Sequence, residues 1–388
     1  MTAAAAPAAP TLAEFTAEAG EFLRAHASLR PELAQVAWGV GSDDVTLPLT
    51  ASVPDEVERR QVAAAREWRR TCFDAGFGWI TGPPELGGRG LPAEYERAFV
   101  ELEKGFDVPD RAITRTGVNI IGPSLLAHGS DPVKAEILPA VHRGDLILCQ
   151  LFSEPDAGSD LANIATRAER DGDEWVLNGQ KVWSSGAHYA DYGLCIARTS
   201  TEGRKHEGLT AFLVKLDAPG MEIRRIRQMT GGAEFDEVFL SDVRVPDTFR
   251  VGEPGAGWAI TLAVLMAERA AIGDESVPDD RLVRRAIQLA AALGRDTDPV
   301  VRQQLVDAHI RLQVTRWLVE RILGRVPAGD VPGPELAMSK LGTTNAMQAL
   351  GQAASTILGT RMVSDGGDWG TYAWSRFVLG VPGLRIGG

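Results

Sequence analysis

QLFSEPDAGSD, residues 150–160, is the stretch in which the chain changes character and on which our interpretation of the fold depends. Leu151 and Phe152 are apolar and end a predicted strand. The remainder is a turn rich in glycine and short polar side chains. Such a turn exposes backbone N–H groups and hydroxyls that can bind a ligand. Taken alone, the pattern fits a capped loop as well as a binding loop.

A second informative stretch, NGQKVWSSG at 178–186, lies shortly downstream. Asn178 and Gly179 separate two apolar runs and predict a β-hairpin, because Asn-Gly accepts the positive φ of a type I′ turn. Further runs typical of strands follow at 192–199, 209–216 and 236–245. We therefore expect a small antiparallel β-domain over residues 146–250.

Helical patterns lie on both sides of this segment. Thr11 with Glu14 predicts a capping box, and Asp131 before Pro132 predicts an N-cap. Residues 55–75 are typical of a charged amphipathic helix, and 258–272 and 281–293 are long apolar-rich runs. Apolar residues at three- and four-residue steps predict a helix at 301–323, and the pattern continues at 335–362. Without alternating strands and helices, a doubly wound nucleotide fold is disfavoured.

The expected fold class is therefore α+β, mainly α. The N-terminal helical domain is expected over residues 1–145, the middle antiparallel β-domain over 146–250, and a C-terminal helical bundle over 251–388.

Composition and charge exclude several classes of protein. The formal net charge is −12 and the pI is near 5.1, which argues against nucleic-acid binding. No apolar run is long enough for a membrane span, and Met1–Pro10 lacks the features of a signal peptide. The three cysteines lie far apart without CxxC spacing. We thus expect no disulfide framework, no metal and a cytoplasmic location.

Several motifs together resemble those of the acyl-CoA dehydrogenase family. Signals for nicotinamide, P-loop and serine-hydrolase sites are missing. EPDAGSD and NGQKVWSSG match the family's flavin-binding signature in order and spacing. The resemblance continues at 84–91, 122–139, 237–246 and 252–258, and so covers nearly the whole chain. It implies FAD bound between a β-domain and a four-helix bundle, and an acyl-CoA substrate.

The resemblance also implies which residues bind FAD and substrate. The flavin is expected to contact Gln150, Phe152 and Ser153 on one side, and Trp183 and Ser185 on the other. Ser159 matches the position that faces CoA or the thioester. Two of these residues have a structural alternative: Trp183 also fits a cross-strand aromatic, and Ser159 a turn-capping serine.

The expected reaction requires a carboxylate that removes the α-proton while the β-hydrogen leaves as hydride. Such a base works best when it is shielded from water. Most relatives place it near the C-terminus, where this chain has Gly387; a minority carry it on a helix beside an arginine. Glu268, alone among apolar neighbours and followed by Arg269, matches that second arrangement. Alternatively, Glu268 pairs with Arg269 or faces water.

Two departures from the family pattern concern contacts between subunits. The motif that reaches a neighbouring subunit's FAD reads GRDTDP at 294–299, so only Arg295 keeps an expected phosphate role. The Gln-x-x-Gly-Gly segment is replaced at 356–360. The chain also ends where relatives continue through a closing helix.

The resemblance implies partners as well as a reaction. Electrons are expected to pass to an electron-transfer flavoprotein. Apolar helix faces at 301–362 predict a homodimer or tetramer, or a hetero-oligomer. Two alternatives stay open: a non-catalytic partner subunit of a mixed oligomer, and an oxygen-using oxidase or monooxygenase. The helix-borne glutamate favours a branched or bulky acyl group.

Overall fold

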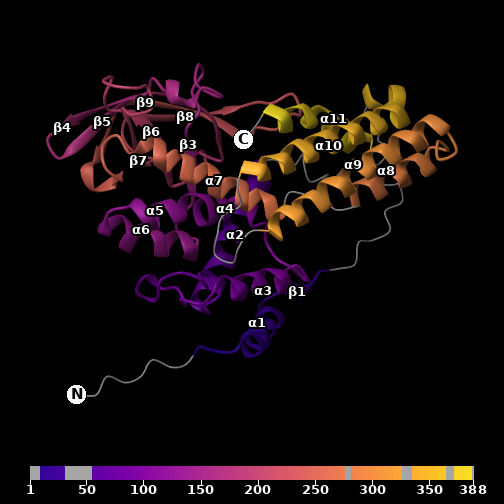
Figure 1. The fold of residues 1–388 in the computed structure, drawn as a ribbon, viewed down its shortest axis with the longest axis horizontal. Helices are drawn as coiled ribbons and strands as arrows, with labels where there is room; N and C mark the ends of the chain where they lie inside the picture. The colour runs from indigo at the N-terminus through magenta and orange to yellow at the C-terminus, as the bar shows by residue number, and fades with distance from the viewer. Residues whose placement is uncertain (1–8, 31–54, 276–280, 326–333, 364–370, 387–388) are drawn as a thin grey trace. The chain divides into compact units, whose positions relative to one another are not determined.

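The computed structural model describes residues 9–30, 55–275, 281–325, 334–363 and 371–386 (Figure 1). The described residues form two units. The first contains those up to Arg225 together with Phe235–Val264, and the second contains Ile226–Glu234 and those from Leu265 onward. Among the described residues, no helix is long and apolar enough to cross a membrane.

Helices occupy the first unit as far as Arg143. The longer ones are α1 (Leu12–His26), α2 (Asp55–Asp74), α3 (Ala93–Glu103) and α6 (Asp131–Arg143). Shorter elements lie between them: β1 (Ser28–Leu29), η1 (Pro84–Leu86), β2 (Phe106–Asp107), α4 (Ala112–Arg115), η2 (Thr116–Ile121) and α5 (Gly122–His128). Their core is aromatic and includes Phe15, Phe22, Phe77, Tyr95 and Phe99.

The two predicted helix starts have different outcomes. The capping box of Thr11 and Glu14 is confirmed, with both reciprocal hydrogen bonds present. The N-cap predicted at Asp131 is wrong by one residue, because the hydroxyl of Ser130 accepts the N–H of Val133. Asp131 is consequently the first residue of α6. A serine oxygen caps an orphan N–H as well as a carboxylate does.

Eight strands form one sheet in the described part of the chain. They are β3 (Leu148–Leu151), β4 (Arg167–Asp171), β5 (Glu174–Ser185), β6 (Tyr192–Arg198), β7 (Leu209–Lys215), β8 (Met221–Ile226), β9 (Phe235–Pro246) and β10 (Arg250–Val251). The order is β10-β7-β6-β4-β5-β9-β8, and β3 also pairs with β6. The expected antiparallel sheet holds for most pairs, but β3 and β4 run parallel to β6.

The hairpin predicted at Asn178-Gly179 is wrong. The turn lies six residues earlier, at Gly172-Asp173, where β4 and β5 pair from Asp171 and Glu174 and Gly172 has φ 67°. β5 continues through Asn178-Gly179 opposite a bulge in β9, where the pairing passes from Val243 to Leu240. The glycine is required by close packing, since a Cβ there would lie 2.3 Å from Thr166 Oγ1. Asn178 exchanges two hydrogen bonds of 2.9 Å with Asp242.

Helices form most of the remaining chain: α7 (Gly257–Glu275), α8 (Arg281–Ala292), α9 (Pro299–Leu323), α10 (Ala337–Leu358) and α11 (Thr371–Ile386). Short 3-10 turns occur at Leu161–Asn163, Asp247–Phe249, Pro334–Leu336 and Gly359–Val363. Helices α8 to α11 lie side by side around an apolar core that includes Leu289, Leu312, Leu350, Trp374 and Phe377 (Figure 1).

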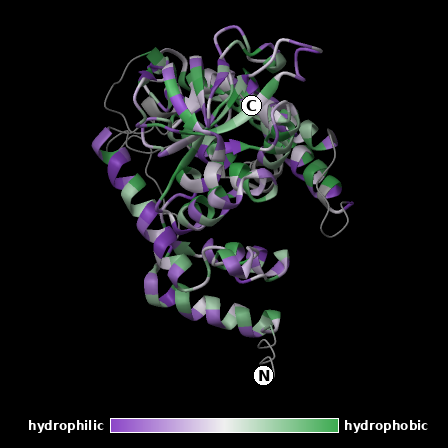
Figure 2. Ribbon diagram, turned by 90° about the vertical axis from the view of Figure 1, so that its left-hand side faces the viewer, coloured by the Kyte–Doolittle hydropathy of each residue, from purple (hydrophilic) through white to green (hydrophobic). Residues whose placement is uncertain are grey.

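Hydrophilic and hydrophobic residues are mixed along the helices (Figure 2), and α8 separates them most clearly into a polar and an apolar face. The boundary between the two units falls inside α7, between Val264 and Leu265. All three cysteines, Cys72, Cys149 and Cys195, are free thiols and are buried.

Candidate functional site

The two stretches singled out in the sequence lie next to each other in the sheet. Val182 of β5 donates its N–H to the carbonyl oxygen of Ser153, just beyond β3, at 2.9 Å. Lys181 Nζ also donates to the carbonyl oxygen of Phe152, at 3.1 Å. Phe152 is buried, while Gln150 and Ser153 are half-buried. The structure thus brings together Gln150, Phe152 and Ser153 with the segment that carries Trp183 and Ser185.

Trp183 is placed by a β-bulge. The register of β5 against β9 shifts between Lys181 and Ser184, and Trp183 has a left-handed φ of 61°. Its side chain is 56% exposed and meets the Phe235 ring edge-on at 5.9 Å between centroids. A tryptophan in this conformation is strained, which is typical of functional sites. The bulge leaves a large flat ring exposed beside the exposed Ser185.

The EPDAGSD segment forms a compact turn. Glu154 and Ala157 exchange backbone hydrogen bonds of 3.0 and 3.1 Å, and Gly158 and Ser159 follow on the exposed side. The carboxylate of Asp160 pairs with Lys205 Nζ at 2.5 Å. Ser159 is therefore open to solvent, where it could meet a ligand.

A fully buried lysine was missed by the sequence analysis. Lys181 Nζ lies 2.8 Å from Glu154 Oε1, directly behind the turn. A charged lysine normally predicts an exposed position. The contrary signal is parity, since Lys181 alternates in step with buried Trp175 and Leu177 along β5. Only its proximity to Glu154 in the folded sheet shows that the charge is paired.

A histidine clamp was also missed, because the histidines are scattered in the sequence. His188 Nδ1 lies 2.8 Å from Asp236 Oδ2, and Nε2 lies 3.0 Å from Glu58 Oε2. Arg225 pairs with the same Glu58 at 3.0 Å. Burial alone would lower the pKa of His188, but the bonds with Asp236 and Glu58 raise it above its ordinary value. The clamp therefore joins α2 to the sheet just beyond Ser185.

The predicted base lies on α7. This helix begins in tight contact with β7, since a Cβ on Gly257 would lie 2.6 Å from the backbone of Leu209. Ile260, Thr261 and Val264 are buried, and helical periodicity places half-buried Glu268 on the same face. Arg269 belongs to the same helix, but its side chain lies outside the described residues, as does Gly387.

Arg295, predicted to contact a phosphate, follows α8. Its guanidinium pairs with Asp298 at 2.8 Å, and Asp298 in turn caps α9 through Val300 and Val301. The half-exposed side chain thus has a structural role of its own. To bind a phosphate of FAD, the Arg295 guanidinium would have to leave Asp298 or bond both groups at once.

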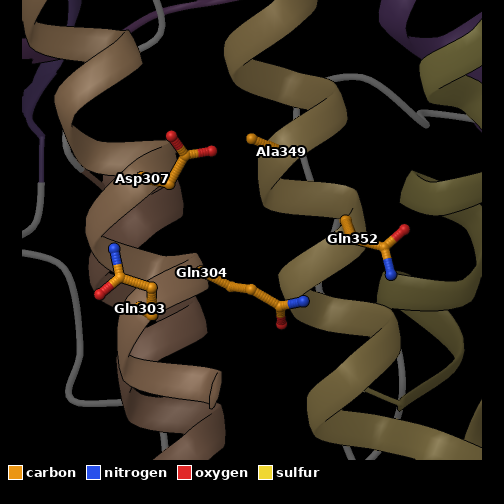
Figure 3. Close-up of a pocket in the computed structure, with 5 residues that line it drawn as sticks. All are labelled: Gln303, Gln304, Asp307, Ala349 and Gln352. Atoms are coloured by element: carbon orange, nitrogen blue, oxygen red, sulfur yellow. The ribbon is translucent and has the colours of Figure 1, made fainter. Parts of the chain in front are cut away.

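A polar pocket of about 300 Å³ lies between α9 and α10 (Figure 3). Gln303, Gln304 and Asp307 line it from α9, and Ala349 and Gln352 from α10. Gln304 extends toward α10 across the gap (Figure 3). None of the lining residues belongs to the set predicted from the sequence.

The residues around the β3–β5 junction suit an isoalloxazine ring. Such a ring has a broad apolar face and a polar edge. The exposed indole of Trp183 offers a flat surface, and Ser153 and Ser185 add hydroxyls beside it. The chemistry of these groups therefore fits the flavin that the motifs imply.

Comparisons with known proteins agree over most of the chain. Models of the acyl-CoA dehydrogenase family match in order: the N-terminal domain at 49–145, the middle domain at 149–243 and the C-terminal domain at 255–388. The acyl-CoA dehydrogenase IpdE1 of Mycobacterium tuberculosis is 39% identical over 76% of each chain. IpdE1 of Mycolicibacterium smegmatis is 35% identical over 81% of each chain.

Solved structures give the same result. The Tcur3481-Tcur3483 steroid ACAD superposes with a TM-score of 0.71 at 26% identity, covering 98% of this chain and 94% of that one. The ChsE4-ChsE5 complex from Mycobacterium tuberculosis gives a TM-score of 0.67 at 26% identity, over 100% and 95%. The mainly helical α+β fold is thereby confirmed. The chain is an FAD-dependent oxidoreductase that dehydrogenates acyl-CoA, and it belongs to the acyl-CoA dehydrogenase family.

Proposed function

We propose that the chain introduces an α,β double bond into a bulky acyl-CoA, with Glu268 as the base that removes the α-proton. The observation that carries the proposal is the junction of β3 and β5, where Val182 N–H reaches Ser153 O at 2.9 Å. It unites Gln150, Phe152 and Ser153 with Trp183 and Ser185 as one FAD-binding surface. FAD, when bound, supplies the redox chemistry by accepting the β-hydride.

The chain's own residues bind, orient and move a proton. Trp183 would pack its indole on the flavin ring. Gln150, Phe152 and Ser153 would contact the ring through backbone groups, and the hydroxyls of Ser153 and Ser185 would bond its polar edge. Exposed Ser159 is assigned to the CoA or thioester side. Half-buried Glu268 lies on the face of α7 that is buried at Ile260 and Val264. Arg269 orients the substrate electrostatically, and Arg295 contacts a phosphate of FAD.

The proposed substrate class follows from two sources. The helix-borne glutamate resembles that of family members acting on branched or bulky substrates. A structure similar over 98% of this chain is described as a steroid ACAD. We therefore assign a polycyclic acyl thioester, with an electron-transfer flavoprotein as acceptor. The three-domain division at 145/146 and 250/251 is part of the same proposal.

Anaerobic stopped-flow reduction of the flavin tests this function. Glu268→Gln should leave FAD bound and the fold intact, because the amide is nearly isosteric, but slow flavin reduction by about 10²–10⁴-fold. Glu253→Gln, which changes an exposed glutamate just before α7, is the matched control and should reduce at the wild-type rate. A polycyclic acyl-CoA should reduce the flavin faster than a straight-chain one.

The second candidate is a partner subunit in a mixed assembly. It is favoured by the similarity to the Tcur3481-Tcur3483 steroid ACAD and the ChsE4-ChsE5 complex, each of which is named for two components. If Glu268→Gln alters flavin reduction only a few-fold, the base belongs to another chain and this candidate takes precedence. Rapid oxygen consumption during turnover, with no need for an electron-transfer flavoprotein, would instead identify an oxidase or monooxygenase.

A further inference from the structure

A buried ion pair lies behind the junction of β3 and β5. The side chain of Lys181 is fully buried and that of Glu154 is 6% exposed, with 2.8 Å between Nζ and Oε1. Removing two charges from water costs so much that apolar residues of the same volume often stabilise a fold equally well. Stability alone therefore gives little reason for a charged pair at this place, and geometry is the better explanation.

Lys181 uses all its donors on fixed acceptors. Besides Glu154, Nζ donates to the carbonyl oxygens of Phe152 at 3.1 Å and Ile196 at 2.7 Å. An ammonium group has three N–H donors, so none is left over. One side chain of β5 thus binds the end of β3 and the middle of β6.

Glu154 is held just as completely from the other side. Its Oε2 accepts the N–H of Ala165 at 2.7 Å, and its Oε1 accepts that of Thr166 at 3.0 Å. Burial alone would raise the pKa of Glu154, but Lys181 and these hydrogen bonds hold it below its ordinary value. The carboxylate consequently remains charged and connects the turn to the chain entering β4.

The pair adjoins both predicted flavin segments. Phe152 and Ser153 precede Glu154, and Val182 and Trp183 follow Lys181. The N–H of Val182 bonds Ser153 O at 2.9 Å, immediately beside the bond from Lys181 to Phe152 O. The register shift that exposes Trp183 begins at Lys181 itself. Movement of the lysine would therefore displace both segments together.

We propose that Lys181 and Glu154 are positioning residues, which hold the Phe152–Ser153 backbone and the Trp183 bulge at the separation needed to bind the flavin ring. The proposal rests on the function assigned above only for the identity of those segments as the FAD-binding surface. Both side chains are buried behind the surface and bonded to protein groups, so neither is available to a ligand. Their effect passes through the backbone of the neighbouring residues.

The test is FAD binding by a charge-free pair in the full-length protein. Lys181→Gln/Glu154→Gln removes both charges yet keeps amides that hydrogen-bond each other, while the shorter amide at 181 cannot bridge both carbonyls. We expect a folded protein whose dissociation constant for FAD rises at least about tenfold. The shape of the bound flavin's visible absorption band should change as well, because the ring sits in an altered environment.

Glu103→Gln is the matched control. Glu103 is another buried carboxylate, bonded to Trp68 Nε1 at 2.9 Å and to Arg111, but it lies among the N-terminal helices. The Glu103→Gln variant should have a lower denaturation midpoint, with unchanged FAD affinity and an unchanged flavin spectrum. If the double variant folds and binds FAD with wild-type affinity and spectrum, Lys181 and Glu154 have no positioning role.

A milder variant covers the case in which the double variant fails to fold. Glu154→Asp keeps the charge but shortens the side chain by one methylene, and it should weaken FAD binding a few-fold with an altered spectrum. Unchanged FAD binding there would also overturn the inference. A wild-type protein that binds FAD but dehydrogenates no acyl-CoA would refute the proposed function alone, since the FAD measurements still test the positioning pair.

Discussion

Trp183 combines backbone strain with exposure. A non-glycine residue in the left-handed region costs about 1–2 kcal/mol. Here the residue is a tryptophan with φ 61° whose ring is more than half exposed, so neither backbone preference nor burial explains it. The left-handed backbone and the exposed ring are both explained if Trp183 is positioned to contact a ligand. The strain is then tolerated because the bulge aims the indole outward.

Trp183→Gly separates the two contributions. Glycine accepts the positive φ, so the denaturation midpoint should stay the same or rise, whereas the FAD dissociation constant should increase about tenfold through loss of aromatic contact. Trp183→Phe keeps a ring and should lose less affinity. The two quantities are measured by chemical denaturation and FAD titration. A glycine variant with unchanged FAD affinity would return Trp183 to a cross-strand role.

His188 predicts a pH dependence of stability. Its pKa is raised in the folded state by Asp236 and Glu58, so its contribution is fully present below the unfolded pKa of about 6.5 and is lost as pH rises through the higher folded value. His188→Gln should therefore destabilise by about 1–3 kcal/mol near pH 6 and by less near pH 9. Denaturation curves at both pH values measure this, with exposed His309→Gln as control. An equal loss of stability at pH 6 and at pH 9 would mean that His188 is not charged in the folded protein.

The candidate site could be located from sequence only in part. The segments 150–160 and 178–186 were found because short polar turns and ordered motifs are local features. Their contact could not be derived, since it depends on pairing of β3 with β6 and on the position of β5. Lys181 was missed because a charged side chain normally faces water, although its position alternates in step with buried Trp175 and Leu177 of β5.

At the scale of elements, α9 has two apolar faces. Val301, Leu305, Ala308 and Leu312 are buried in the helical core. On the opposite side an apolar stripe is exposed: Val306 50%, Ile310 53%, Val314 52% and Trp317 62%. Their spacing of four, four and three residues keeps them in one line. A second apolar line on a helix of a water-facing bundle indicates a contact with another chain.

Ile310→Asp tests association through this stripe. A charge in the middle of an apolar contact should shift the oligomer toward monomer, weakening association at least about tenfold because the buried carboxylate would be unpaired. His309→Asp is the matched control, since it adds the same charge about 100° round the helix. Light scattering coupled to size-exclusion chromatography measures both. Identical masses for wild type and Ile310→Asp would place the interface elsewhere.

Helices and strands were predicted well where a local sequence pattern sets the conformation. They were predicted poorly where contacts with distant residues set it. Helix α9 was expected over 301–323 and spans Pro299–Leu323, because its periodicity is long and regular. Asn178-Gly179 was expected to turn, yet it lies inside β5. The pair is needed there for a bulge: the glycine makes room for Thr166 and the asparagine binds Asp242. Both demands come from residues remote in sequence.

For the whole molecule, FAD content should depend on association. The purified protein should be yellow. If a second subunit completes each FAD site, as the resemblance implies, monomer produced by Ile310→Asp should carry less FAD per chain than wild-type oligomer. The amount of FAD per chain is measured across the chromatographic peaks as the flavin absorbance relative to the protein absorbance. A monomer that retains FAD in full would show that one chain suffices, and a colourless wild type that takes up no added FAD would contradict the flavin site.

The buried cysteines make this chain a convenient background for selective labelling. Burial raises the pKa of Cys72 to about 12 and that of Cys195 to about 11, and it raises the pKa of Cys149 as well. Thiolate, not thiol, attacks maleimides, so the native protein should react slowly. His309→Cys would add one exposed thiol beside the apolar stripe of α9. A fluorophore attached there would follow subunit exchange in real time with every native cysteine still in place.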